Sequence, residues 1–577
     1  MAPPGRTPSV SVRPRRPPGS VDRVSDASQV PPSAGDDAFV RLATDALDDV
    51  LGFEPVEATA LGDHRFDDRL PDLGADGVEE ARRVLAGWLG AVDSVDESAL
   101  SPDQRVDHEI LRSALAARLF TVEEVRPHTW DPLAANPGSG VYLLLAREFA
   151  PLADRLRSAS ARLAAVPAAL AAARESLGEM PRVHVETAVA QFRGTQVLLS
   201  GPLEAALDGE PLLRQEVEPA RTAALEAIDD HVRWLDAALP SSERDPRLGP
   251  ELYAARLWHT LDTETPPDSV LVRAESHLMQ LEAELADVLA GRDARVAFDR
   301  LADAGPVDDA SVLSLCEHGL AAATRFVRER ELVTVPDGWE SMVRVIEMPE
   351  IHRGVAVAYC EPPGPLERAP LPTFFAVSPT PADWPVDRVR SFYREYNAFM
   401  LRNLAVHEAM PGHVLQLAHS RAYRGGTPVR AAFSSGAFVE GWAVHAEELM
   451  VRQGYGGEAQ RLQQIKTQMR TTINAIVDVR VHAHGMTEAE AMTLMTDRGH
   501  QEVGEAAGKW RRALLTSAQL STYFVGWSEV SDLVRGLRRD RPGADLRACN
   551  DELLAHGSPS PRHLRTLLGL GAAPTPP

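Results

Sequence analysis

Helical periodicity runs through most of this chain and limits the folds that it can adopt. Between residues 152 and 177, four leucines recur every seven residues: Leu156, Leu163, Leu170 and Leu177. Alanine fills most of the intervening positions, so the leucines form one apolar stripe on a strong helix former, in which Pro167 predicts a kink. Similar helical patterns cover residues 182–207, 211–239, 266–290 and 309–333. The sequence therefore predicts a mostly α-helical protein.

Residues 341–378 differ from the rest in composition. Short runs of β-prone residues are separated there by proline and glycine, at 343–346, 355–359 and 373–377. Helical patterns resume at about residue 386 and continue nearly to the end. We expect one small β-sheet embedded in a helical protein.

The two ends of the chain are rich in proline and poor in large apolar side chains. Such segments cannot bury enough surface to offset their ordering entropy, so residues 1–37 are expected to form a disordered tail. The last residues, from Pro574 on, are interpreted in the same way. The remainder divides into an N-terminal helical part, 38–335, and a second helical part, 336–573, which holds the sheet and the motifs described below.

Charge and cysteine content exclude several classes of protein. A formal net charge of −23 argues against nucleic acid as a partner. Three widely spaced cysteines fit a reducing compartment, and argue against a disulfide framework or a thiolate metal site. Neither a secretory signal nor an apolar run long enough to span a membrane is evident. These features predict a cytoplasmic protein without a membrane partner.

The segment from His407 to His413, HEAMPGH, carries the clearest chemical signal. In the zinc signature HExxH, two histidines four residues apart share a helix face, and the adjacent glutamate acts as the base. Here the histidines are six residues apart, which on a regular helix turns the second about 120° away from the first. Pro411 lacks an N–H group and Gly412 accepts unusual dihedral angles, so a bulge in the helix would bring the two rings together. The motif predicts two metal ligands, His407 and His413, and a base, Glu408.

A third ligand is expected on a later helix. Glu440 lies 27 residues beyond His413, a separation that accommodates a helix, a loop and a returning helix. Two histidines and one carboxylate leave a coordination position for water, as in catalytic rather than structural zinc sites. Glu447 shares the helix face of Glu440, and either supports a ligand histidine or is simply a solvated or paired glutamate.

These residues resemble a known family. From about residue 38 to 570 the chain is similar to the bacterial domain-of-unknown-function 885 family, and through it to zinc peptidases of the gluzincin type, such as thimet oligopeptidase and angiotensin-converting enzyme. The segments that carry the resemblance are 407–416, 440–443, Val477-Asp478 with His482, 485–487, Gln519 with Tyr523 and Gly526, and Leu553-Leu554 with Gly557. The resemblance implies a two-lobed helical peptidase with one zinc ion in a deep channel and the small sheet along one wall.

The resemblance also suggests further site residues. Tyr523 occupies the position of a family tyrosine and would donate a hydrogen bond to the oxyanion; a buried structural tyrosine is the alternative. His482 is a candidate for the same hydrogen bond to the oxyanion or for substrate binding. The alternative is that it is a histidine of the core. His445 stands where a tyrosine is usual and Arg480 where glycine is common, and contacts of either with metal ligands or substrate are left open. Other departures from the family are Val414 and Cys549-Asn550.

The function expected from these observations is zinc-dependent hydrolysis of short peptides, by an oligopeptidase or a carboxypeptidase-like enzyme. One alternative is a zinc amidohydrolase that acts on a non-peptide amide. Another is a catalytically silent helical binding protein, against which the retained Glu408 argues. The sequence leaves the cleavage specificity and the oligomeric state open.

Overall fold

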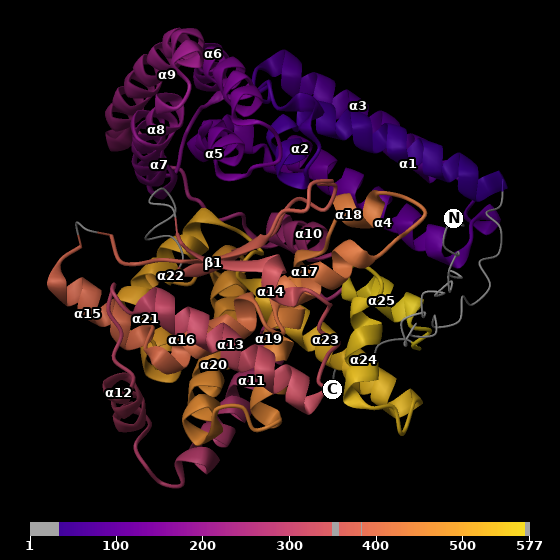
Figure 1. Ribbon diagram of the computed structural model, residues 1–577, viewed down its shortest axis with the longest axis vertical. Coiled ribbons are helices and arrows are strands. Elements are labelled where there is room, and N and C mark those ends of the chain that lie inside the picture. The colour runs from indigo at the N-terminus through magenta and orange to yellow at the C-terminus, as the bar shows by residue number, and fades with distance from the viewer. Residues whose placement is uncertain (1–33, 349–356, 382–383, 572–577) are drawn as a thin grey trace, which may run out of the picture.

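Helices dominate the computed structural model, which describes residues 34–348, 357–381 and 384–571 (Figure 1). The mostly α-helical class is thus confirmed. The upper layer in Figure 1, coloured from indigo to magenta, consists of α1 (Ala34–Phe53), α2 (Pro55–Leu61), α3 (Ala75–Asp93), α4 (Pro102–Phe120), α5 (Gly138–Ala146), α6 (Leu152–Ser176), α7 (Arg182–Ser200), α8 (Pro202–Asp208) and α9 (Pro211–Ala238).

The remaining helices form the lower assembly in Figure 1. They are α10 (Pro250–Leu261), α11 (Pro267–Leu289), α12 (Ala294–Ala304), α13 (Val312–Arg330), α14 (Trp339–Met342), α15 (Val386–Glu395), α16 (Ala398–Glu408), α17 (His413–Ala422), α18 (Val429–Ala432), α19 (Gly436–Arg452), α20 (Gly457–His484), α21 (Glu488–Thr493), α22 (Val503–Leu515), α23 (Ser521–Asp540), α24 (Leu546–Leu554) and α25 (Pro561–Leu567).

Local sequence explains where several helices begin and end. In α6 the predicted stripe of Leu156, Leu163 and Leu170 is buried, and Pro167 lies within the helix. The pattern at 182–207 predicted one helix, but the structure has two, because Pro202 begins α8 directly after Gly201. Proline is favoured in the first helical turn, where its missing N–H group would have no partner.

Residues 34–37, which were expected to belong to the tail, are helical, since α1 begins at Ala34 with Asp36 and Asp37 in its first turn. Acidic side chains are favourable there because they face the positive end of the helix dipole. The rest of the predicted tail, and the predicted C-terminal tail, lie outside the described residues. Among the residues described, no helix has the length and apolar character needed to cross a membrane.

The hydrophobic cores separate the N-terminal helices from the C-terminal ones at a point in the chain before residue 335. Helices α10 and α11 bury leucines in one core with α20, and α13 packs with α16 and α19 in another. Helices α5–α9 form a separate core. Helices α10–α13 thus group with the C-terminal helices, and the predicted boundary at residue 335 does not coincide with a change of core.

The predicted small sheet is present, with strand order β1-β3-β2. β1 (Val343–Glu347) pairs in parallel with β3 (Thr373–Val377), and β2 (Ala358–Glu361) pairs with β3 in antiparallel orientation. The second β-prone run was expected at 355–359; residues 355 and 356 lie outside the described residues. Within the described part of the chain β2 pairs with β3 alone, so β2 is an edge strand.

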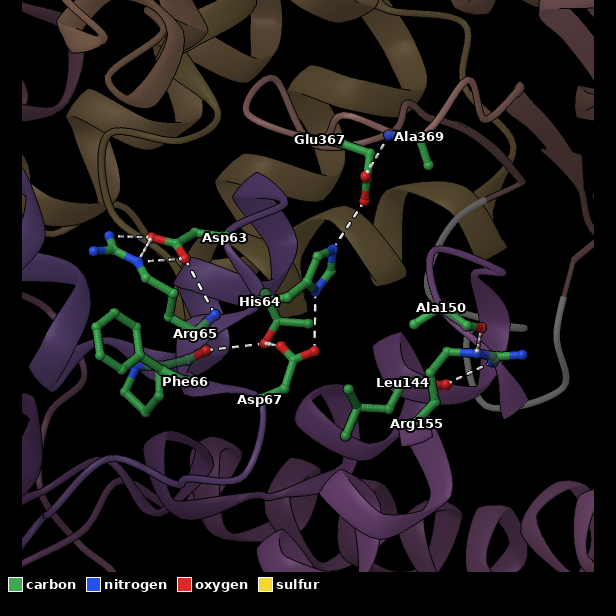
Figure 2. A network of polar contacts seen from close by, with 12 residues as sticks. Asp63, His64, Arg65, Phe66, Asp67, Leu144, Ala150, Arg155, Glu367 and Ala369 are labelled. Carbon is green, nitrogen blue, oxygen red and sulfur yellow. Dashed lines mark hydrogen bonds and ion pairs between the residues drawn. The ribbon is translucent and has the colours of Figure 1, made fainter. Parts of the chain in front are cut away.

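A partly buried polar network joins the N-terminal layer to the segment between β2 and β3 (Figure 2). The imidazole of His64 contacts Asp67 through Nδ1 at 3.0 Å and Glu367 through Nε2 at 2.9 Å. Its ring stacks on Phe149 with centroids 3.7 Å apart. Burial alone would lower the pKa of His64, but the two carboxylates raise it above its ordinary value.

We expect this network to make the stability of the protein depend on pH. Because the pKa of His64 is higher in the folded than in the unfolded chain, its stabilisation is fully present below the unfolded pKa, about 6.5, and is lost as pH rises through the folded pKa. Thermal unfolding should therefore show a larger loss of Tm for His64→Gln at pH 5.5 than at pH 9. His318→Gln, at an exposed histidine bound to the carbonyl of Ser314, is the control. An equal loss at both pH values would contradict the prediction.

Candidate metal centre

The HEAMPGH segment is a break between two helices rather than the bulge that the sequence predicted. Helix α16 ends at Glu408 and α17 begins at His413, and the Met410–Pro411 peptide bond between them is cis. Residues 409–412 fold back on the last turn of α16, where the N–H of Gly412 donates to the carbonyl of Val406 at 3.0 Å. Pro411 has no N–H to continue the helix, so the chain tightens and His413 returns beside His407.

Gly412 is required here by space and not by an unusual φ. A Cβ atom at this position would lie 1.8 Å from the carbonyl oxygen of His407, and Gly412 itself has a φ of −71°. The backbone therefore approaches the last turn of α16 more closely than any other residue allows. The indole N–H of Trp442 fastens the same segment by donating to the carbonyl of Pro411 at 2.8 Å.

The three predicted metal ligands converge. One ligand atom from each of His407, His413 and Glu440 lies within 4.8 Å of the other two. The Nε2 atoms of both histidines are 3.4 Å from Oε2 of Glu440, an oxygen that is buried and makes no hydrogen bond. Tetrahedral zinc with bonds of about 2.0–2.1 Å separates its ligand atoms by about 3.3–3.4 Å. The residues present therefore fit a zinc ion.

A buried carboxylate orients His407. Its Nδ1 is 2.7 Å from Oε1 of Glu447, and the other oxygen of Glu447 accepts from the side-chain amide of Asn403 at 2.6 Å. A carboxylate can only accept, so Nδ1 donates to Glu447, and Nε2 is the nitrogen that faces Glu440 and is free to bind a metal ion once it is deprotonated. Glu447 thus takes the supporting position that the sequence offered as one of two readings. Asn403, one turn before His407, was missed because an asparagine in a helix carries no such signal.

Electrostatics at the cluster favour an anionic Glu440 and a proton-accepting Glu408. The nearby histidines lower the pKa of Glu440 in spite of its burial, which alone would raise it. Burial raises the pKa of Glu408, and the charges of His407 and His413 offset part of this effect. The side chain of Glu440 is 24% exposed, so solvent can reach the cluster from its side.

The small sheet lies directly beside the predicted base. The backbone of Cys360, in β2, lies close enough to the carboxylate of Glu408 to lower its pKa, and β2 packs against α16. The strand next to the predicted base is therefore an edge strand of the sheet. The deep channel that the resemblance implies stays a prediction.

Tyr523 lies near the cluster because α19 and α23 pack closely. A Cβ atom on Gly441 would be 2.3 Å from the backbone of Gly526, and one on Gly526 would be 2.0 Å from the carbonyl of Ala437. Burial, and then the charge of Glu440, raise the pKa of Tyr523. The phenol oxygen accepts a hydrogen bond from Nη2 of Arg512 at 3.3 Å. Arg512 was not singled out in the sequence, since nothing local links it to the motif.

His482 is held in a different environment. Its Nε2 is 3.0 Å from the carbonyl of Ala513 and 2.9 Å from that of Thr516, and its ring stacks on Tyr253. A nitrogen shared by two carbonyls is the donor, which is how a core histidine is satisfied. None of the contacts described for His482 involves the three converging ligands. The structure thus favours the packing interpretation of this residue.

The two residues left open in the sequence also lie away from the cluster. Arg480 pairs with Glu275 of α11. Both ring nitrogens of His445 are buried without a hydrogen-bond partner, and burial lowers the pKa of its imidazole. On α19 His445 faces a different side from Glu440, since five residues correspond to about 140° around a helix. Neither residue contacts a proposed ligand in the described structure.

Fold and site together define a large helical protein with a potential three-ligand metal centre at a helix break. The chain belongs to the family described as "Bacterial protein of unknown function (DUF885)", whose model matches residues 55–568. Among solved structures it is similar to a "putative lipoprotein of unknown function" from Shewanella oneidensis, with 27% identity and a TM-score of 0.78 over 92% of this chain and 99% of that one. A "putative lipoprotein" from Colwellia psychrerythraea shares the fold, at 14% identity and a TM-score of 0.76 over 93% and 99% of the two chains. The comparison with curated proteins gives no match.

Proposed function

We propose that this protein is a zinc-dependent peptidase with His407, His413 and Glu440 as its ligands. The observation that carries the proposal is the 3.4 Å spacing of both Nε2 atoms from a buried carboxylate oxygen that makes no hydrogen bond, beside a buried Glu408. The similarity to gluzincin peptidases is part of this proposal. Incubation of the zinc-loaded protein with a library of short peptides, with and without a chelator, tests it.

The side chains near the cluster have separate roles in the proposed reaction. Zinc, when bound, lowers the pKa of water and polarises a carbonyl group. Glu408 takes the proton of the attacking water and delivers it to the leaving amine, for which a carboxylate of raised pKa is suited. The hydroxyl of Tyr523 donates to the substrate oxygen as negative charge develops on it.

The edge strand favours a peptide over a non-peptide amide as the substrate. An extended peptide can add to the free edge of a sheet through its backbone, and the edge strand β2 lies beside Glu408. A non-peptide amide would not use such an edge, so the amidohydrolase is the second candidate. If the protein is instead a catalytically silent binding protein, it should take up zinc and cleave no peptide in the library.

Arg512 is expected to bind the free C-terminal carboxylate of the substrate. This guanidinium bonds to Tyr523 and has no carboxylate partner among the described residues. For a peptide with a free C-terminus, Arg512→Gln should raise KM about 10- to 100-fold, the effect of losing a charge-assisted hydrogen bond. The amidated form of the same peptide should be little affected. Arg511→Gln, which removes an exposed pair with Glu186, is the control. Equal losses on both peptides would assign Arg512 to the support of Tyr523 alone.

Tyr523→Phe should lower kcat and leave KM and zinc content nearly unchanged. The ring is kept, so packing persists, while a donor to the developing oxyanion is lost at a cost of about 10²–10³-fold in kcat. Tyr455→Phe, at a buried tyrosine whose hydroxyl makes no hydrogen bond, controls for the substitution itself. Intact turnover together with a stability loss of about 1 kcal/mol would show that Tyr523 is structural.

We propose a cytoplasmic location on the strength of three cysteines that are all free. The names of the two similar structures favour a different place, since a lipoprotein is attached to a membrane. Fractionation of cells that express the full-length protein distinguishes the two. Recovery in the membrane fraction that detergent alone releases would overturn the cytoplasmic assignment.

A further inference from the structure

A second potential ligand site lies where the N-terminal layer meets α10. A cavity of about 710 Å³ opens there between α3, α4, α10 and the π-helical turn η3 (Thr121–Val125). Small-molecule sites typically have volumes of about 300–1,000 Å³. Most of its wall is apolar, with Phe53, Leu70, Leu73 and Val122 among the lining residues. None of the proposed zinc ligands lines it.

Arg256 is an unpaired cation in this cavity. Its Nη1 donates to Oγ1 of Thr121 at 3.3 Å, whereas its Nε is buried without a partner, and no carboxylate pairs with it among the described residues. Burial lowers the pKa of Arg256, and no nearby acid offsets this effect. Arg118, which also lines the cavity, instead pairs with Glu54 at 3.0 Å. A half-buried guanidinium without a counter-ion lowers the stability of the fold, because its charge is partly desolvated and not compensated. A bound anion would compensate this charge.

The groups around Arg256 suit a single negative charge. The imidazoles of His128 and His259 also line the cavity and can donate hydrogen bonds in their neutral form. Three further acids that line the cavity, Asp72, Asp76 and Glu80, are exposed at its rim. Thr121 and Val122 reach the cavity from a π-helical turn, a distortion that is frequent at functional sites.

We propose that this cavity binds a small organic carboxylate, with the carboxylate on Arg256 and an apolar body along Phe53, Leu70 and Val122. One guanidinium flanked by neutral imidazoles matches a monoanion better than a phosphate dianion. The apolar wall explains why the ligand would carry a hydrocarbon part. This site is independent of the proposed peptidase activity.

Isothermal titration of the full-length protein with 4-phenylbutyrate, its neutral amide and inorganic phosphate tests the proposal. The carboxylate should bind at least about tenfold more tightly than the amide and more tightly than phosphate, and Arg256→Gln should remove this preference. Arg300→Gln, at an exposed arginine of α12, should change nothing. A carboxylate bound at the metal centre would persist in Arg256→Gln, so the two sites are distinguishable.

A second variant keeps the test valid if Arg256→Gln folds poorly. Val122→Phe narrows the cavity and leaves the guanidinium in place, so binding of 4-phenylbutyrate should weaken with little change in Tm. An unpaired arginine also predicts that Arg256→Gln does not lower Tm in the absence of ligand. No binding of the carboxylate at millimolar concentration, or equal binding of carboxylate and amide, would overturn the proposal.

Discussion

His407→Ala, His413→Ala and Glu440→Ala should each lose most of the bound zinc, whereas the parent protein carries about one zinc per chain. Each substitution removes one of three converging ligand atoms, and two remaining ligands hold zinc much more weakly. Metal analysis after dialysis against a weak chelator measures the effect. His419→Ala is a matched control on α17, because its ring bonds to the carbonyl of Thr334 instead of facing the cluster.

His413 is the decisive residue of the three, because its place depends on the helix break at residues 409–412. If His413→Ala retains zinc as well as the parent does, the break does not serve metal binding and another ligand must exist. Gly412→Ala tests the same geometry without changing a ligand. Its Cβ would overlap the carbonyl of His407, so it should weaken zinc binding even in protein that remains folded.

Glu408→Gln should keep zinc and lose nearly all turnover. The amide has the shape of the carboxylate but cannot accept a proton, and general-base assistance contributes about 10²–10⁴-fold. Glutamine has the length and shape of glutamate, so the side chain should keep its position beside Cys360. Steady-state rates on a cleaved peptide, measured at equal zinc content, give the size of the loss.

The matched control for this substitution is Glu448→Gln. It changes another buried glutamate, which accepts from the indole of Trp527 at 2.9 Å and pairs with Arg452 instead of with a proposed ligand. Its turnover should stay close to that of the parent. Undiminished activity in zinc-loaded Glu408→Gln would refute the proposed mechanism and leave the metal site standing.

The sequence by itself determined the helical class, the small sheet and the identity of the three converging residues. Helix and strand periodicity depend on neighbours within a few residues, so the stripe of α6 and the strands β1 and β3 lie where the pattern predicts. A pair of histidines around a glutamate is likewise a local signal. The ability of two imidazoles to bind a metal ion, and of the adjacent carboxylate to accept a proton, belongs to the side chains themselves and can be inferred from the sequence.

The tertiary structure alone decided how these residues meet. The six-residue spacing was compatible with a bulge, yet the chain breaks into two helices, because Gly412 can approach the carbonyl of His407 without a clash. The contact of His407 with Glu447 and that of Tyr523 with Arg512 join segments whose spacing depends on helix packing. His482 was a candidate site residue, but its partners are backbone carbonyls of a distant segment, and no local sequence pattern identifies these partners. Periodicity predicts which face of a helix is buried, but only the packed neighbours determine which atoms that face touches.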